Sequence, residues 1–221
     1  MKRIGQAVCL PILTLVLGYL LIYVVGKPVI DVASSALTLF MLADTPVQSK
    51  TVHAEEITLV TQTHDKPDEI PSSQVPYPVG GQQYGQVIIE SLAINEPLYF
   101  DDNQEILRDA VGQYIGSVMP GQIGTTMIGG HNYPDRFGRL LGIQENMLIQ
   151  VQTTWGLYTY KVTSMDIRNY RDPQVIELLN QRNDRQLILY TCYPVTMIGF
   201  TDERIFVFAT FVSGPIINPD L

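Results

Sequence analysis

Three residues of this chain, Cys192, His131 and Arg204, could together carry out nucleophilic acyl transfer. A cysteine thiolate is a strong nucleophile, and an imidazole beside it can remove or return a proton. A guanidinium is a permanent cation, so near a thiol it favours the thiolate and can stabilise an oxyanion. Cys192 and His131 each stand at the end of a predicted strand, and Arg204 opens another. Residues at strand ends can share one mouth of a barrel, so the three are candidates for one catalytic site.

Each of these residues also has a purely structural interpretation. An unpaired thiol is often buried packing, a lone histidine is often a hydrogen-bonded structural residue, and Arg204 can pair with one of the two acids before it. Cys9 lies in an apolar run, where a thiol most often packs, and we interpret His53 and His64 as solvated. Local sequence by itself leaves these alternatives open.

The elements that must position these residues are mostly short strands. Alternating and apolar runs separated by turn residues predict about eight strands with a few short helices. Such a pattern indicates a mostly β protein with a closed or nearly closed barrel. The predicted strands include Val87–Leu92, Ile94–Phe100, Thr125–Gly130, Met147–Gln152, Tyr158–Ser164, Leu187–Cys192 and Arg204–Val212. The predicted helices are one or two turns within Asp101–Tyr114, capped by Asp101 or Asp102, and Pro173–Asn180.

Three motifs, taken in order, resemble the sortase family of membrane-anchored cysteine transpeptidases. They are Gly121-x-x-Gly124-Thr125-x-x-Ile128-x-Gly130-His131, Leu189-Tyr190-Thr191-Cys192 and Arg204-Ile205-Phe206-Val207. The segments Phe137-Gly138-Arg139-Leu140 and Val87-x-Ile89-x-x-Leu92 are similar to further family segments. Glu90 departs from the family, which commonly has a proline there, and we expect this to affect strand pairing more than catalysis. The likeness covers roughly residues 84 to 212 and implies a sortase-type β barrel.

The resemblance implies the chemistry and its partners. A Leu-Pro-x-Thr-Gly or Leu-Pro-x-Thr-Ala sorting signal near the carboxy terminus of a surface protein would be cleaved through a Cys192 thioester. His131 would transfer protons, Arg204 and a backbone N–H near Tyr193 would hold the oxyanion, and a peptidoglycan precursor amine would accept the protein. The expected substrate contacts are Thr191, Tyr193, Met197 and Ile198. The sequence Thr-Cys-Tyr-Pro resembles class D enzymes, and a class D-like or class A-like role is preferred to pilus polymerisation.

The amino-terminal residues predict a membrane anchor. Residues 4–26 contain no charged side chain, and a helix of this length spans a hydrocarbon core of roughly 30 Å. Lys2 and Arg3 precede it and favour a cytoplasmic amino terminus with an extracellular catalytic domain. A cleaved signal peptide is the alternative, but the run is long and continues into a second apolar stretch, 28–43. We therefore predict an anchor at 1–43, a tether at 44–84, a catalytic domain at 85–214 and a tail at 215–221.

Composition excludes several other classes. The net charge of −8 argues against a nucleic-acid-binding protein, which would carry a basic surface. Hydrophobic residues make up 46% of the chain, too many for a disordered protein. Two cysteines without a Cys-x-x-Cys pair, and no acidic cluster, indicate neither a metal site nor a cofactor. Two other functions stay open: a cysteine hydrolase, and a non-catalytic membrane-tethered β-barrel binding module.

Overall fold

The structure is a computed structural model. It describes residues 57–61, 69–195 and 201–219, together with Val16, Gly18, Tyr19 and Tyr23. The chain divides into two compact units, Met1–His53 and Ala54–Leu221. In the first unit the four described residues are helical. Within the part of the chain that is described, no helix combines the length and the apolar character needed to cross a bilayer. Cys9 and most of the predicted anchor lie outside the described residues.

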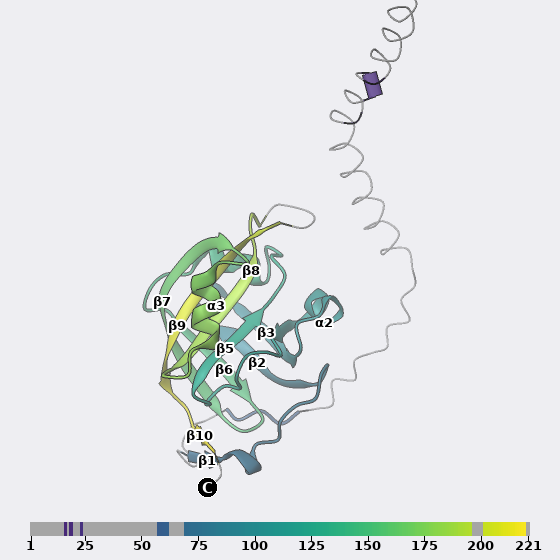
Figure 1. Ribbon diagram of the computed structural model, residues 1–221. Helices are drawn as coiled ribbons and strands as arrows, with labels where there is room; N and C mark the ends of the chain where they lie inside the picture. Colours follow the sequence, from purple (N-terminus) through teal and green to yellow (C-terminus); the bar gives the residue numbers. More distant parts are fainter. Residues whose placement is uncertain are drawn as a thin grey trace, which may run out of the picture. The chain divides into compact units, whose positions relative to one another are not determined.

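The second unit is built on a closed barrel whose strands follow the order β2-β3-β4-β5-β8-β9-β7-β6 (Figure 1). These strands are β2 (Gln83–Ile89), β3 (Ile94–Phe100), β4 (Val111–Gln113), β5 (Gly124–Gly129), β6 (Leu148–Thr153), β7 (Leu157–Asn169), β8 (Arg185–Cys192) and β9 (Glu203–Ser213). The pairs β3–β4 and β5–β8 are parallel, and the other neighbours in the barrel are antiparallel. The predicted mostly β, eight-stranded barrel with short helices is confirmed.

The two faces of the barrel wall carry different side chains because strand residues alternate in direction. On β8, Leu187 and Leu189 belong to the interior core, whereas Ile188 packs in a separate cluster outside the wall with Val175 and Phe206. Burying such aliphatic and aromatic side chains stabilises the fold by about 25 cal/mol per Å² of apolar surface removed from water. The sequence alternation therefore assigns each position of β8 and β9 to one face.

Short helices connect the strands. Helix α3 (Pro173–Asn180) has the predicted bounds, begins with the proline, and is capped by Asp172, whose Oδ1 accepts from the backbone N–H of Gln174 at 2.8 Å. Helix α2 (Gln104–Asp109) is capped by Asn103, not by the predicted Asp101 or Asp102. Among the described residues, three 3-10 helices complete the connections: η1 (Ser72–Gln74), η2 (Glu90–Leu92) and η3 (Phe137–Gly142).

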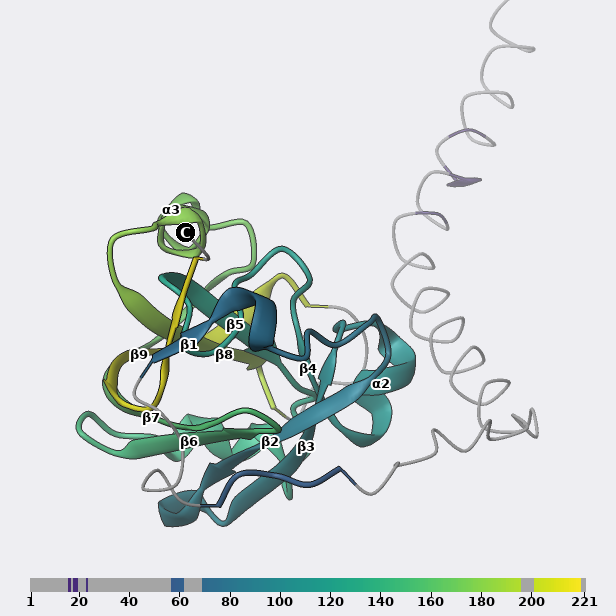
Figure 2. The same cartoon turned by 90° about the horizontal axis from the view of Figure 1, so that it is seen from below.

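The folded unit extends beyond the predicted 85–214 at both ends. Strand β1 (Glu69–Pro71) pairs in parallel with β10 (Ile216–Asn218), and Ile70 and Ile217 are buried in the core. The part of the predicted tether from Glu69 onward and the start of the predicted tail are therefore packed residues. Figures 1 and 2 show this two-stranded sheet at one end of the barrel. The backbone N–H of Ile217 donates to Gly121, just before β5, so it is the end at which β5 and β8 begin.

Candidate active site

Strand register brings the three predicted catalytic residues to the opposite end of the barrel. Cys192, the last residue of β8, lies directly across from Arg204 on β9. On the other side of β8, Gly129 is the partner of Tyr190 in the parallel ladder. His131 follows Gly129 by two residues, as Cys192 follows Tyr190. The order β5-β8-β9 therefore puts Arg204 on one side of the thiol, while His131, two residues beyond the end of β5, follows the strand on the other side.

The three residues lie on the outer face of the barrel. Ile188 and Phe206 pack outside the wall, and alternation assigns Cys192 and Arg204 to the same side as these residues. Met127, two residues before Gly129, packs against that outer cluster too, so His131 takes the next outer position. A substrate reaching these residues would lie across the wall, outside the packed interior.

Tyr190 precedes Cys192 by two residues on β8 and packs in the same outer cluster as Ile188. An ideal Cβ on Gly129 would lie within 2.7 Å of two ring carbons and the hydroxyl oxygen of Tyr190, so glycine leaves room for this side chain in its present position. The Tyr190 hydroxyl donates a hydrogen bond to the Asp102 carboxylate from the loop before α2. Burial, first, and the charge of Asp102, second, raise the pKa of Tyr190, so the phenol stays protonated. Cys192 is half-buried and forms no disulfide.

The His131 imidazole is half-buried and lies against an aromatic ring. Its centroid is 5.3 Å from that of Tyr133, with the planes inclined by 50°. Burial, and to a smaller extent the positive charge of Arg136, hold the pKa of His131 below its ordinary value of 6.5. The neutral imidazole, which can accept a proton, is therefore favoured at physiological pH.

The guanidinium of Arg204 is held by backbone and aromatic groups. Its Nη1 donates to the carbonyls of Thr201 and Glu203, the latter at 2.8 Å. Its central carbon lies 5.6 Å from the ring centroid of Tyr170. These contacts orient a permanent cation next to Cys192, where an oxyanion would form.

The predicted substrate contacts fall into two groups. Thr191 is 1% exposed and its hydroxyl is buried on the inner side of the wall, whereas Tyr193 is half-buried against the core. Met197 and Ile198 lie outside the described residues. The Tyr193 N–H donates to Glu203 O at 3.0 Å. The Tyr193 N–H itself is thus engaged, because β8 and β9 remain hydrogen-bonded up to that residue.

A second arginine, Arg168, lies next to Arg204 and was missed by the sequence reasoning. It is the register partner of Arg204 on β7. The predicted strand ended at Ser164, whereas β7 continues to Asn169. Arg168 therefore lay outside every predicted strand and was not considered. Arg168 pairs with the carboxylates of Asp166 at 2.8 Å and Asp172 at 3.6 Å. These acids compensate the repulsion expected between like charges on facing strand positions.

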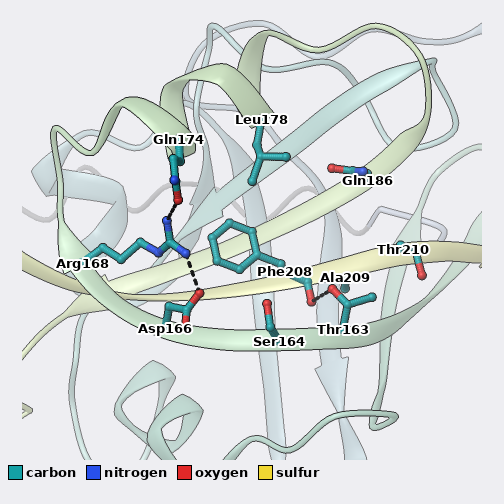
Figure 3. A pocket seen from close by; sticks show the side chains of 10 residues that line it. All are labelled: Thr163, Ser164, Asp166, Arg168, Gln174, Leu178, Gln186, Phe208, Ala209 and Thr210. Atoms are coloured by element: carbon teal, nitrogen blue, oxygen red, sulfur yellow. Dashed lines mark hydrogen bonds and ion pairs between the residues drawn. The ribbon is translucent and has the colours of Figure 1, made fainter.

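Arg168 also lines a pocket of about 230 Å³ between α3 and the strands β7, β8 and β9 (Figure 3). Gln174 and Leu178 face it from α3, and Phe208 faces it from β9. The guanidinium carbon of Arg168 is 5.8 Å from the Phe208 ring centroid. The pocket lies at the side of α3, whose Val175 packs on Ile188 and Phe206, on the same strands as Cys192 and Arg204.

The fold and the site indicate a cysteine enzyme of a known barrel class, and comparison identifies that class. The sequence model of the family described as "Sortase domain" matches residues 87–212. The match covers more than half of the chain, and the chain belongs to the sortase family, whose members are cysteine transpeptidases.

Individual relatives agree with this assignment. Sortase D of Bacillus subtilis (strain 168) is 26% identical over 136 residues, which are 62% of this chain and 67% of that protein. A Clostridium perfringens Sortase D5 transpeptidase has a similar fold, with a TM-score of 0.54 and 18% identity over 62% of this chain and 83% of that one. Sortase C from Clostridium perfringens SM101 also aligns, with a TM-score of 0.54 and 21% identity over 62% and 73% of the two chains. These structures share the barrel.

Proposed function

We propose that this sortase cleaves a Leu-Pro-x-Thr-Gly-like or Leu-Pro-x-Thr-Ala-like sorting signal and joins the released protein to a cell-wall amine. The observation that carries the proposal is that Cys192 lies across from Arg204 on the neighbouring strand, while His131 follows the end of the strand on the other side of β8. A nucleophile flanked by a proton-transfer group and a fixed cation is the arrangement that acyl transfer requires.

The reaction proceeds in two acyl-transfer steps. His131 takes the thiol proton of Cys192 as the sulfur attacks the threonine carbonyl, and it delivers this proton to the departing amine when the peptide C–N bond breaks. The acyl group is then held as a thioester. An incoming amine attacks that thioester, the C–S bond breaks, and His131 accepts the proton of the amine. An amide is formed, and the thiol is regenerated for the next cycle.

Arg204 is the residue that would stabilise the oxyanion in both steps. It lies across from Cys192, and its guanidinium is a permanent cation whose planar N–H groups can point at a developing negative charge. The N–H of Tyr193 is bonded to Glu203, so in our proposal the charge is carried by Arg204. Removal of one such donor typically lowers kcat by about 10²–10³-fold.

The substrate would lie on the outer face beside Tyr190, with Tyr193, Met197 and Ile198 after β8 in contact with the signal. Thr191, buried behind Cys192, would support the site from inside the wall. A class D-like or class A-like enzyme of this kind acts on surface proteins and on a peptidoglycan precursor amine. We place it at the cell membrane as a single-pass protein with an extracellular catalytic domain, where confinement raises the effective concentration of both substrates.

The test is incubation of the purified protein with a panel of sorting peptides and a triglycine acceptor, followed by mass spectrometry. We expect a thioester on Cys192 and an amide product with triglycine, both absent in Cys192→Ala. Arg204→Gln should lower kcat by about 10²-fold or more. Arg182→Gln is the matched control, because Arg182 also donates from Nη1 to two backbone carbonyls, those of Leu179 and Gln181, but is exposed before the start of β8.

The two alternative functions give different outcomes in the same assay. A cysteine hydrolase would release the free acid and form no amide with triglycine. A binding module would form no thioester, and Cys192→Ala would behave as the wild type. Either result would refute the proposed transpeptidation.

A further inference from the structure

The ladder between β5 and β8 ends just before the two residues that must exchange a proton. The last backbone hydrogen bond that joins these strands among the described residues runs from Gly130 N to Tyr190 O, at 3.1 Å. His131 follows Gly130 directly, and Cys192 follows Tyr190 after one residue, Thr191. Pro194, two residues after Cys192, has no N–H and offers only a carbonyl to a neighbouring strand. Another contact must therefore hold the two loops together.

The Asn132 side chain provides that contact. Its Nδ2 donates to Pro194 O at 3.1 Å, across the site from the loop after β5 to the loop after β8. Asn132 directly follows His131, and both Asn132 and Pro194 are half-buried. The bonds Gly130–Tyr190 and Asn132–Pro194 thus bracket the catalytic pair, one on each side along the strands.

The loop that carries Asn132 is anchored to the core. The backbone N–H groups of Arg136 and Gly138 both donate to Tyr133 O at 3.0 Å. Phe137, at the start of η3, is completely buried. An added Cβ on Gly138 would approach Asn132 O to 2.5 Å, so η3 packs directly against the Asn132 backbone. The backbone of Asn132 is therefore fixed by packing against η3, and its side chain restrains the chain after Cys192.

We infer that Asn132 is a positioning residue that holds the loop after Cys192 against the loop after His131 and thereby sets the separation of thiol and imidazole. The inference rests on the proposed function for its catalytic meaning, but the restraint itself acts on Cys192 in the free protein. Proton transfer depends steeply on this separation, and a misplacement of about 1 Å can lower the rate by about 10²-fold.

The variants are Asn132→Leu, which keeps a similar volume without a donor, and Asn132→Gln, which keeps the amide donor on a longer side chain. Asn180→Leu is the matched control. The Asn180 Nδ2 also donates to a backbone carbonyl, that of Ile176 at 2.9 Å, but within α3 and at an exposed position. Unfolding midpoints followed by Trp155 fluorescence show whether each variant is folded.

Two readouts test the inference. In the first, Asn132→Leu should lower kcat for a sorting peptide by about 10–100-fold with KM nearly unchanged, and Asn132→Gln should recover part of the loss. In the second, iodoacetamide labelling of the Cys192 peptide, quantified by mass spectrometry, should slow in Asn132→Leu by the same factor as in His131→Ala. Asn180→Leu should match the wild type in both.

Labelling of Asn132→Leu at the wild-type rate would overturn the inference, as would an Asn132→Gln protein no better than Asn132→Leu. The proposed function fails separately, if the wild type forms no Cys192-dependent product. In that case slower labelling of the folded Asn132→Leu protein still supports the positioning role, because labelling needs no substrate.

Discussion

Replacement of Gly129 by alanine should destabilise the protein through one side chain, Tyr190. The new Cβ would lie within 2.7 Å of two ring carbons and the hydroxyl oxygen of Tyr190, whereas non-bonded carbon atoms prefer 3.5–4.0 Å. The ring must therefore move by about 1 Å. It is held on one side by its hydrogen bond to Asp102 and on another by Phe206, whose ring centroid is 6.3 Å away. Movement of the ring breaks the bond to Asp102.

The expected magnitude follows from these contacts. A hydrogen bond to a charged acceptor contributes about 1.5–3 kcal/mol, and the half-buried Asp102 places this bond at the lower end. Overpacking adds about 1–3 kcal/mol. Alanine has fewer backbone conformations than glycine in the unfolded chain, and this offsets about 0.4–1 kcal/mol of the lost stability. We therefore expect Gly129→Ala to lower the free energy of unfolding by about 2–4 kcal/mol.

The assay is urea unfolding followed by the fluorescence of Trp155, the one tryptophan of the chain. Trp155 is 2% exposed and stacks on Tyr84 with centroids 5.4 Å apart, so unfolding changes its environment strongly. Gly142→Ala is the control, because a Cβ there would meet only Leu92 Cδ2, at 3.7 Å. It should change the stability by less than about 0.5 kcal/mol.

A double-mutant cycle isolates the clash. In a Tyr190→Ala background the ring is absent, so Gly129→Ala should then cost less than about 0.5 kcal/mol. Tyr190→Phe keeps the ring and loses only the bond to Asp102, at about 1.5 kcal/mol. If Gly129→Ala costs the same with and without the Tyr190 ring, or costs nothing in the wild type, the assigned role of Gly129 is refuted.

Three further predictions concern other parts of the fold. Burial and Arg136 lower the pKa of His131, so the folded state binds fewer protons than the unfolded state around pH 6.5. The contribution of neutral His131 to the free energy of unfolding is therefore present above that pH and is lost as the pH falls. Arg136→Gln should raise the pKa of His131 towards 6.5, measured by NMR titration of the imidazole; no change would contradict the electrostatic assignment. Asp172→Ala removes the cap of α3 and should cost about 1 kcal/mol in urea unfolding, and an unchanged midpoint would exclude a contribution from the cap. Thr153→Val removes the hydroxyl that accepts from Trp155 N at 3.2 Å and should cost about 1–3 kcal/mol, with altered Trp155 emission; wild-type emission and stability would count against it.

Much of the barrel could be predicted from local sequence. Strand alternation is a period-2 pattern, so the apolar run ending at Cys192 and the one opening at Arg204 indicated β8 and β9. Proline at the first position of α3 gave that helix its correct start. The predicted cap of α2 was wrong, because Asp101, Asp102 and Asn103 are all good capping residues and the sequence does not distinguish them. The backbone decided for Asn103: Asp101 has φ of 100°, which cannot lead into a helix.

The candidate site was predictable in its residue types and in the strand ends that carry them. Its arrangement depends on the parallel pairing of β5 with β8, between segments about 60 residues apart in the chain. Such pairings are decided by which strands can bury their inner faces together, and the alternation along one strand does not show which strand will lie next to it. Arg168 was missed for a related reason, since the last part of β7 has no fully buried residue and forms a strand by pairing with β9.

The sequence by itself determined the chemistry available to this protein: a single cysteine in the folded unit, a histidine and an arginine at strand ends, and alternation that builds a barrel wall. Only the tertiary structure decided that these residues lie at one end of the barrel, on the outer face. It also decided that Tyr190 lies over Gly129 and that Asn132 reaches Pro194. The physical reason is that side-chain type and periodicity are local properties, whereas register, close approach and hydrogen bonds between distant loops exist only after the core has packed.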